Sequence, residues 1–183
     1  LFNNMETPKH PLTIQQSSFL TKLRSYLPEK IYFYGSILRD DFLPGISDID
    51  VLYFSKENLQ TTVHKLYRLL TQDSNATRIQ MLHFLYHSSE TKKVISGYKI
   101  KYTNVDNGII IEISMYDDEN KELIIQEQLQ KARIPYFIVY AMLILKILAY
   151  KYRVLPEDTF RWIKDNLFIT MSGIKNTLFT YEH

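Results

Sequence analysis

Two apolar runs joined by an Asn-Gly turn constrain this chain more than any other feature of its sequence. Residues 98–103 and 109–116 are rich in β-branched and aromatic side chains, which is typical of strands. The five residues between them end in Asn107-Gly108, and this dipeptide favours the tight turns that join antiparallel strands. The pattern therefore predicts a β-hairpin.

The spacing of apolar residues and prolines predicts the remaining elements. Further strands are expected at 31–34, 48–54 and 78–86. Helices are expected at 13–27, 57–72, 119–133, 136–152 and 158–180, with prolines as their punctuation. The chain is therefore expected to divide into an α/β (α+β) domain over residues 1–118 and a helical segment over 119–183.

Composition excludes several classes of protein. Apolar residues make up 45% of the chain and the net charge is +2, so the chain is neither disordered nor a protein that coats DNA. The absence of cysteine excludes disulfides, thiolate metal sites and a cysteine nucleophile. The longest apolar run, 136–150, contains Lys146 and is shorter than the ~20 residues of a membrane span, so a core helix is expected. We expect no membrane association and an intracellular, cytoplasmic location, although no sequence motif specifies the location.

The most informative stretch places a Gly-Ser turn before two alternate aspartates. The strand at 31–34 leads into Gly35-Ser36, where a helix is expected to begin and to offer free N–H groups to an anion. The Ser36 hydroxyl and the Arg39 guanidinium suit phosphate oxygens. Asp48 and Asp50 are alternate strand residues, so their carboxylates lie side by side and repel each other unless a cation separates them.

A divalent cation and a third acid follow from this pair. Mg²⁺ is the usual cation for oxygen ligands beside phosphates. A phosphate-binding turn together with paired carboxylates is typical of two-metal phosphoryl transfer. Glu112 is the best third ligand, because a charge inside the apolar run 109–115 is costly without a partner. Asp117 is the fallback, although acids at the end of a strand usually cap the next helix.

The segments 34–39 and 47–51, with Pro44 between them, resemble the signature of the polymerase beta-like nucleotidyltransferase superfamily. The resemblance implies a mixed, mostly antiparallel nucleotidyltransferase sheet flanked by helices, and two-metal, NTP-dependent nucleotidyltransferase activity. It implies that the triphosphate of a nucleotide such as ATP is held by Gly35, Ser36 and Arg39. It also implies that Asp48, Asp50 and Glu112 are the catalytic ligands of Mg²⁺ or Mn²⁺, although the family more often has Asp at the last position.

The helix around residues 145–155 resembles part of the central domain of poly(A) polymerases and terminal uridylyltransferases. Lys146 matches the lysine that reaches the triphosphate in those enzymes, whereas Leu148, Tyr150 and Val154 depart from the pattern. The alternative is that Lys146 extends from a core helix to solvent. With a phosphate partner, the helical segment would pack over the nucleotide site.

The expected function is therefore transfer of NMP from an NTP to an acceptor hydroxyl, with single-stranded RNA as the preferred acceptor, as in RNA tailing. One alternative is a minimal nucleotidyltransferase that modifies a small molecule or a protein, of the antibiotic-modifying or toxin–antitoxin type. Another is a non-enzymatic interaction module. Lys99 and Lys101 are interpreted as a solvated strand face, with contact to a nucleic-acid backbone as the alternative.

Overall fold

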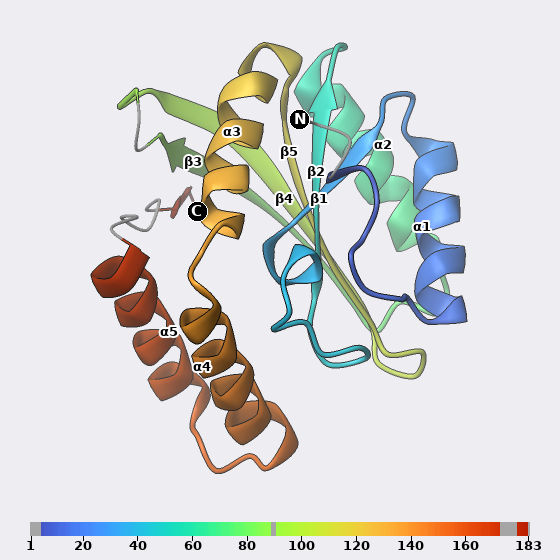
Figure 1. Ribbon diagram of the computed structural model, residues 1–183. Coiled ribbons are helices and arrows are strands. Elements are labelled where there is room, and N and C mark those ends of the chain that lie inside the picture. The colour runs from blue at the N-terminus through green and yellow to red at the C-terminus, as the bar shows by residue number, and fades with distance from the viewer. Residues whose placement is uncertain (1–4, 89–90, 173–178, 183) are drawn as a thin grey trace.

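The computed structural model describes residues 5–88, 91–172 and 179–182, and its centre is a mixed sheet (Figure 1). The order of the six strands across the sheet is β1-β2-β5-β4-β3-β6. The strands are β1 (Ile31–Tyr34), β2 (Ile49–Ser55), β3 (Arg78–His87), β4 (Val94–Asn104), β5 (Ile109–Asp117) and β6 (Phe179–Glu182). Only β2 and β5 pair in parallel among these described strands, so the expected mixed, mostly antiparallel sheet is confirmed.

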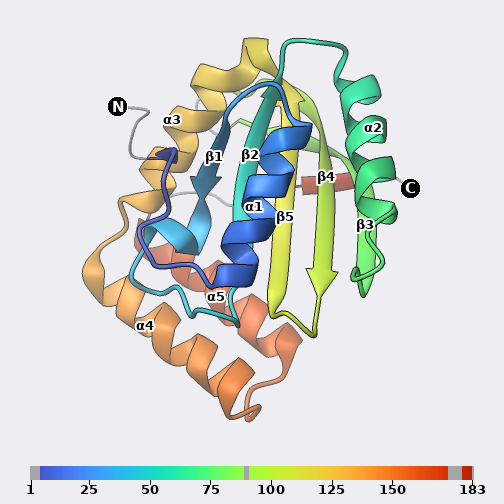
Figure 2. The same cartoon turned by 90° about the vertical axis from the view of Figure 1, so that its right-hand side faces the viewer.

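Helices cover both faces of the sheet. α1 (Ile14–Tyr26) and α2 (Leu59–Thr71) lie on one face, and α3 (Lys121–Ala132) lies on the other (Figures 1 and 2). Beyond α3, the chain forms α4 (Tyr136–Lys146), a π-helical turn η4 (Ile147–Lys151) and α5 (Glu157–Ser172). In Figure 2, α4 and α5 lie beyond the end of the sheet at which β2 and β5 begin.

The side chains of β2 alternate between the two faces, as its sequence predicts. Ile49, Val51 and Tyr53 are fully buried in the core formed with α1 and α2. Leu52 and Phe54 belong to a second core, to which α3 contributes. Asp50 therefore lies on the α3 face of the sheet, at the end of β2 that is nearest α4 and α5.

The helix boundaries follow from local hydrogen bonds. Thr13 caps α1 in a capping box, in which its hydroxyl accepts from the Gln16 N–H and the Gln16 side chain accepts from the Thr13 N–H. The Asn58 side chain caps α2 by accepting from the Thr61 N–H. These caps fix the start of each helix within two residues of its expected position.

A buried network attaches α3 to the sheet. Glu127 is 1% exposed, and its carboxylate accepts hydrogen bonds from the hydroxyls of Tyr86 and Ser88. Ile124 and Ile125, one turn before it, are fully buried in the second core. The layer that covers this face of the sheet thus comes from residues beyond 118.

The C-terminal region differs from the sequence prediction. A helix was expected to extend to residue 180, but α5 ends at Ser172 and residues 179–182 form β6, which pairs with β3. The prediction of a helix is wrong at residues 179–180, because pairing with the distant strand β3 outweighs the local apolar pattern. Residues 173–178 of the expected helix lie outside the described residues. Among described helices, none is alone long and apolar enough to cross a membrane; α3 and α4 with their flanking turns meet those limits only as a pair bent by 84°.

Candidate functional site

The turn after β1 packs directly against a carboxylate. Gly35 has φ +72°, and a Cβ atom added there would lie 2.1 Å from Oδ2 of Asp50. Only glycine satisfies both the backbone conformation and this close approach. The helix expected after the turn is η2 (Gly35–Leu38), a single 3₁₀ turn in which Ser36 is buried. Gly35 and Asp50, which are distant in sequence, are therefore brought into contact.

Asp50 and Glu112 lie directly opposite each other on the parallel strands β2 and β5. Neighbouring residues in register share a face of the sheet, so both carboxylates project toward the α3 side. Burial, followed by the charges of Asp48 and Glu112, raises the pKa of Asp50 well above its ordinary value. The charges of Asp48 and Glu112 thus act on Asp50, and these three carboxylates together are called the acid cluster.

The third acid of this cluster has a cationic partner. The Nζ atom of Lys99, on β4, lies 2.5 Å from Oε1 of Glu112, and Lys99 is only 8% exposed. The interpretation of Lys99 as part of a solvated strand face is therefore wrong. The strand order places β4 beside β5, and this non-local arrangement brings the lysine to the acids.

A tyrosine from β1 completes this face. The hydroxyl of Tyr34 lies 3.1 Å from Oγ of Ser114, which is two residues beyond Glu112 on β5. Burial, followed by the charges of Asp50 and Glu112, raises the pKa of Tyr34 well above its ordinary value. Tyr34 therefore stays protonated as a hydrogen-bonding group beside the carboxylates.

Arg39 and Lys146 meet at a different carboxylate, that of Asp41. Asp41 is fully buried; its two oxygens accept from Nε and Nη2 of Arg39 at 2.9 and 3.1 Å, and Nζ of Lys146 lies 3.1 Å from Oδ2. Lys146 also donates to the Asp41 carbonyl oxygen at 2.9 Å. Burial alone would raise the pKa of Asp41, but Arg39 and then Lys146 hold it below its ordinary value. The buried ammonium, for which the sequence suggested a phosphate partner, has this aspartate as its partner in the fold.

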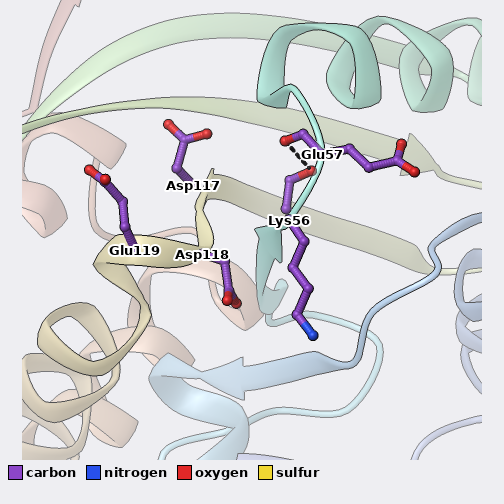
Figure 3. A pocket seen from close by; sticks show the side chains of 6 residues that line it. Lys56, Glu57, Asp117, Asp118 and Glu119 are labelled. Atoms are coloured by element: carbon purple, nitrogen blue, oxygen red, sulfur yellow. Dashed lines mark hydrogen bonds between the residues drawn. The ribbon is translucent and has the colours of Figure 1, made fainter.

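Asp117, the fallback for the third acid, lies at the opposite end of the sheet. It pairs in register with Ser55 at the end of β2, whereas Glu112 pairs with Asp50 near the beginning. Asp117 lines a pocket of about 410 Å³ with Glu57, Asp118 and Glu119, among others (Figure 3). This pocket is separate from the predicted site.

The donor set around Asp50 fits a divalent cation. Asp48 and Asp50 provide the carboxylate oxygens that Mg²⁺ prefers. Burial and then the charges of Asp48 and Glu112 raise the pKa of Asp50, and a cation would offset the part of this effect that comes from the two charges. Among the described residues, no three acidic or histidine side chains are spaced as ligands of one metal ion. Glu112 is held by Lys99 in this arrangement.

Two lysines at the site could not be found from sequence motifs. Lys99 comes from β4, and Lys164 comes from α5. The positive charges of both lysines act to lower the pKa of Asp50. Neither lysine belongs to a local pattern around Asp48 and Asp50. Their proximity follows from the strand order and from the position of α5 at the end of the sheet.

The Asp41 cluster yields a test of stability. Lys146→Met should lower the free energy of unfolding by about 1–3 kcal/mol, because the buried Asp41 carboxylate would lose one of the two cations that contact it among the described residues. Lys151→Met is the matched control, since it removes the same charge from an exposed position of η4. Urea unfolding measures both variants. Equal stabilities would mean that the contact between Lys146 and Asp41 contributes nothing to the fold.

A mixed sheet with acids on neighbouring strands beside a Gly-Ser turn defines the nucleotidyltransferase class, and comparison with known families agrees. The family model described as "Nucleotidyltransferase domain" matches residues 16–167, so this chain belongs to that family. This membership confirms the resemblance to polymerase beta-like nucleotidyltransferases and points to transferase activity on a nucleoside triphosphate.

Solved structures and curated proteins add little to this assignment. One similar structure is described as "Structure and function of the polymerase core of TRAMP, a RNA surveillance complex", with 21% identity and a TM-score of 0.46. The similarity covers 77% of this chain and 41% of that chain, so this chain spans less than half of its length. Comparison with curated proteins gives no match.

Proposed function

We propose that this chain is a Mg²⁺-dependent nucleotidyltransferase that transfers NMP from an NTP to the 3′ hydroxyl of an RNA. The observation that carries the proposal is the register of β2 and β5, in which Asp50 lies opposite Glu112 and against the turn at Gly35. Residues 1–118 are assigned to the catalytic domain, together with α3 and β6, which pack on and extend its sheet, and α4 and α5 are assigned to the helical cover over the nucleotide site.

The positions of the acids support the following assignment of their roles. Asp48 and Asp50 would hold two divalent cations, Mg²⁺ or Mn²⁺, and Glu112 would be a ligand of the acceptor-side cation and would accept the proton of the acceptor hydroxyl. When bound, the metal would neutralise phosphate oxygens and lower the pKa of the acceptor hydroxyl. The acceptor oxygen attacks the α-phosphorus, and pyrophosphate leaves.

The triphosphate is assigned to the turn at the end of β1. Gly35 allows close approach of its backbone, and Ser36 contributes a hydroxyl donor to the same turn. Arg39 and Lys146 supply positive charge beside it while they hold Asp41. Tyr34, protonated beside the acids, is available as a further hydrogen-bond donor.

The acceptor class rests on the sequence of the helix around Lys146. Lys146 matches the triphosphate-contacting lysine of the RNA-tailing enzymes. This match is the reason for proposing RNA, rather than a small molecule or a protein, as the acceptor. A small-molecule or protein-modifying nucleotidyltransferase would use the same acids with a different acceptor.

Incubation with labelled triphosphates tests the proposal. The chain is incubated with Mg²⁺ and each of the four α-labelled NTPs, with and without a single-stranded RNA oligomer. Extension of the RNA supports the proposal, and label on the protein or on an added small molecule supports the alternative acceptors. Absence of any transfer with Mg²⁺ or Mn²⁺, by a chain that folds and binds NTP, would identify an interaction module.

The third acid can be tested by two matched substitutions. Glu112→Gln should lower kcat by at least about 100-fold and change NTP affinity much less, because Asp48 and Asp50 remain to bind the nucleotide-side metal. Asp117→Asn should leave kcat within about threefold of wild type, because Asp117 lies at the other end of β5. Single-turnover kinetics and equilibrium NTP binding measure the two effects. The reverse ranking would assign the third acid to Asp117.

A further inference from the structure

Lys99 reaches the acid cluster from the strand on the far side of Glu112. In the antiparallel pairing of β4 and β5, Lys99 lies opposite Ser114, and its ammonium group extends diagonally to Glu112 at 2.5 Å. The side chain of Lys99 is 10% exposed and that of Glu112 is 18% exposed. The ion pair is therefore largely removed from solvent, where a charge interaction is strong.

The local balance of charge explains why a lysine is favoured there. Asp48, Asp50 and Glu112 contribute three carboxylates, and the charges of Asp48 and Glu112 both act to raise the pKa of Asp50. Lys99 acts in the opposite direction on the same carboxyl group. The ammonium group of Lys99 pairs with Glu112 and partly neutralises the negative charge of the three carboxylates, which is an effect that a bound metal ion would also have.

We propose that Lys99 is the built-in counter-ion of this cluster and competes with a divalent cation for Glu112, so that the lysine limits how tightly the site holds metal. The inference rests on the proposed function, because it takes Asp48, Asp50 and Glu112 as metal ligands. A weakened metal site would favour binding of the ion together with the nucleotide, whose phosphates would supply further oxygen ligands. Lys99 is thus a positioning residue for Glu112.

Lys101 provides an internal control for this inference. Residues opposite each other in antiparallel strands share a face, so Lys101, which lies opposite Glu112, is on the same face as Lys99. It is more exposed than Lys99. Removing its charge changes the field at the site without removing the ion pair between Lys99 and Glu112.

The experiment measures Mn²⁺ binding to the full chain without nucleotide, by the loss of the free-ion signal in electron paramagnetic resonance. Lys99→Met should bind Mn²⁺ about tenfold more tightly than wild type, since a competing cation is removed. Lys101→Met should change the affinity less than about threefold. Lys99→Arg, which keeps the charge, should stay near wild type.

Two further variants make every outcome decisive. In a Glu112→Gln background, Lys99→Met should no longer tighten binding, because the group for which the lysine competes is neutral. Lys99→Gln replaces Lys99→Met should the latter not fold, which circular dichroism detects. Equal effects of the Lys99 and Lys101 substitutions, or a gain that persists in Glu112→Gln, would overturn the role of Lys99.

The proposed function is tested separately in the same titration. The single variant Asp48→Asn, which keeps Lys99, should no longer bind Mn²⁺ if these acids form the metal site. Loss of binding in Asp48→Asn with no effect of Lys99→Met removes the inference and keeps the metal site. Binding that survives Asp48→Asn, or no Mn²⁺ binding to any of the chains, overturns both.

Discussion

Asp50→Asn is expected to abolish nucleotidyl transfer while leaving the metal-free protein at least as stable as wild type. The substitution removes one of two adjacent metal ligands, so kcat/KM should fall by at least about 100-fold. It also removes a carboxylate whose ionisation is opposed by burial and by the charges of Asp48 and Glu112. Transfer assays and urea unfolding in the presence of a chelator measure the two effects.

The same variant has a distinct pH dependence. Because the folded state raises the pKa of Asp50 above its unfolded value of ~3.9, the contribution of this group to stability is full at low pH. That contribution is lost as pH rises from about 4 through the raised pKa. Wild-type stability should therefore show a decline that Asp50→Asn lacks, at about 1.4 kcal/mol for each unit of pKa shift.

Two results would contradict this assignment. A large loss of stability in metal-free Asp50→Asn would make the aspartate a structural residue that the fold requires in its ionised form. Full transfer activity in a folded Asp50→Asn protein would remove it from the metal site. Mg²⁺ gives an additional check, since it should raise the melting temperature of wild type and not that of the variant.

Gly35→Ala is expected to lower the free energy of unfolding by about 2–4 kcal/mol. A methyl group at this position meets Oδ2 of Asp50 at 2.1 Å, and the backbone at φ +72° disfavours any side chain. Either the turn or the carboxylate must move, so transfer should also fall by at least tenfold, in line with the sensitivity of catalysis to small displacements.

Gly45→Ala is the control that separates the two causes. Gly45 has nearly the same conformation, with φ +75°, but nothing lies within 4 Å of an added Cβ atom. Its substitution should cost only the backbone term, about 1–2 kcal/mol, and should spare transfer. If the two alanine variants lose the same stability and the same activity, the contact between Gly35 and Asp50 has no special role.

Features determined by local patterns were predictable from the sequence. The alternation of β2 placed Ile49, Val51 and Tyr53 on one face and Asp50 on the other, and burial of the first three confirms this for the strand, which begins at Ile49, one residue after Asp48. The turn at Asn107-Gly108 joins β4 and β5 as expected. Both features depend on neighbours in sequence, for which periodicity and turn chemistry are informative.

Features determined by pairing between distant parts of the chain were not predictable from the sequence. The sequence does not reveal that β5 lies between β2 and β4, and this order brings Lys99 to Glu112. Nor does it reveal that Asp41, an ordinary acid in a loop, is the shared partner of Arg39 and Lys146. The residue types around a phosphate site could be anticipated, whereas the ion pairs they form within the protein depend on the assembled fold.

The parallel pairing of β2 and β5 has a consequence for the kinetics of folding. Asp50 and Glu112 meet only after the intervening chain, with α2, β3 and β4, has been closed into a loop, whereas the antiparallel neighbours β3, β4 and β5 are consecutive in sequence. We expect the consecutive strands to associate first and β2 to dock against them late. A metal ion then encounters its ligands only in a nearly native chain, so it should slow unfolding without accelerating refolding.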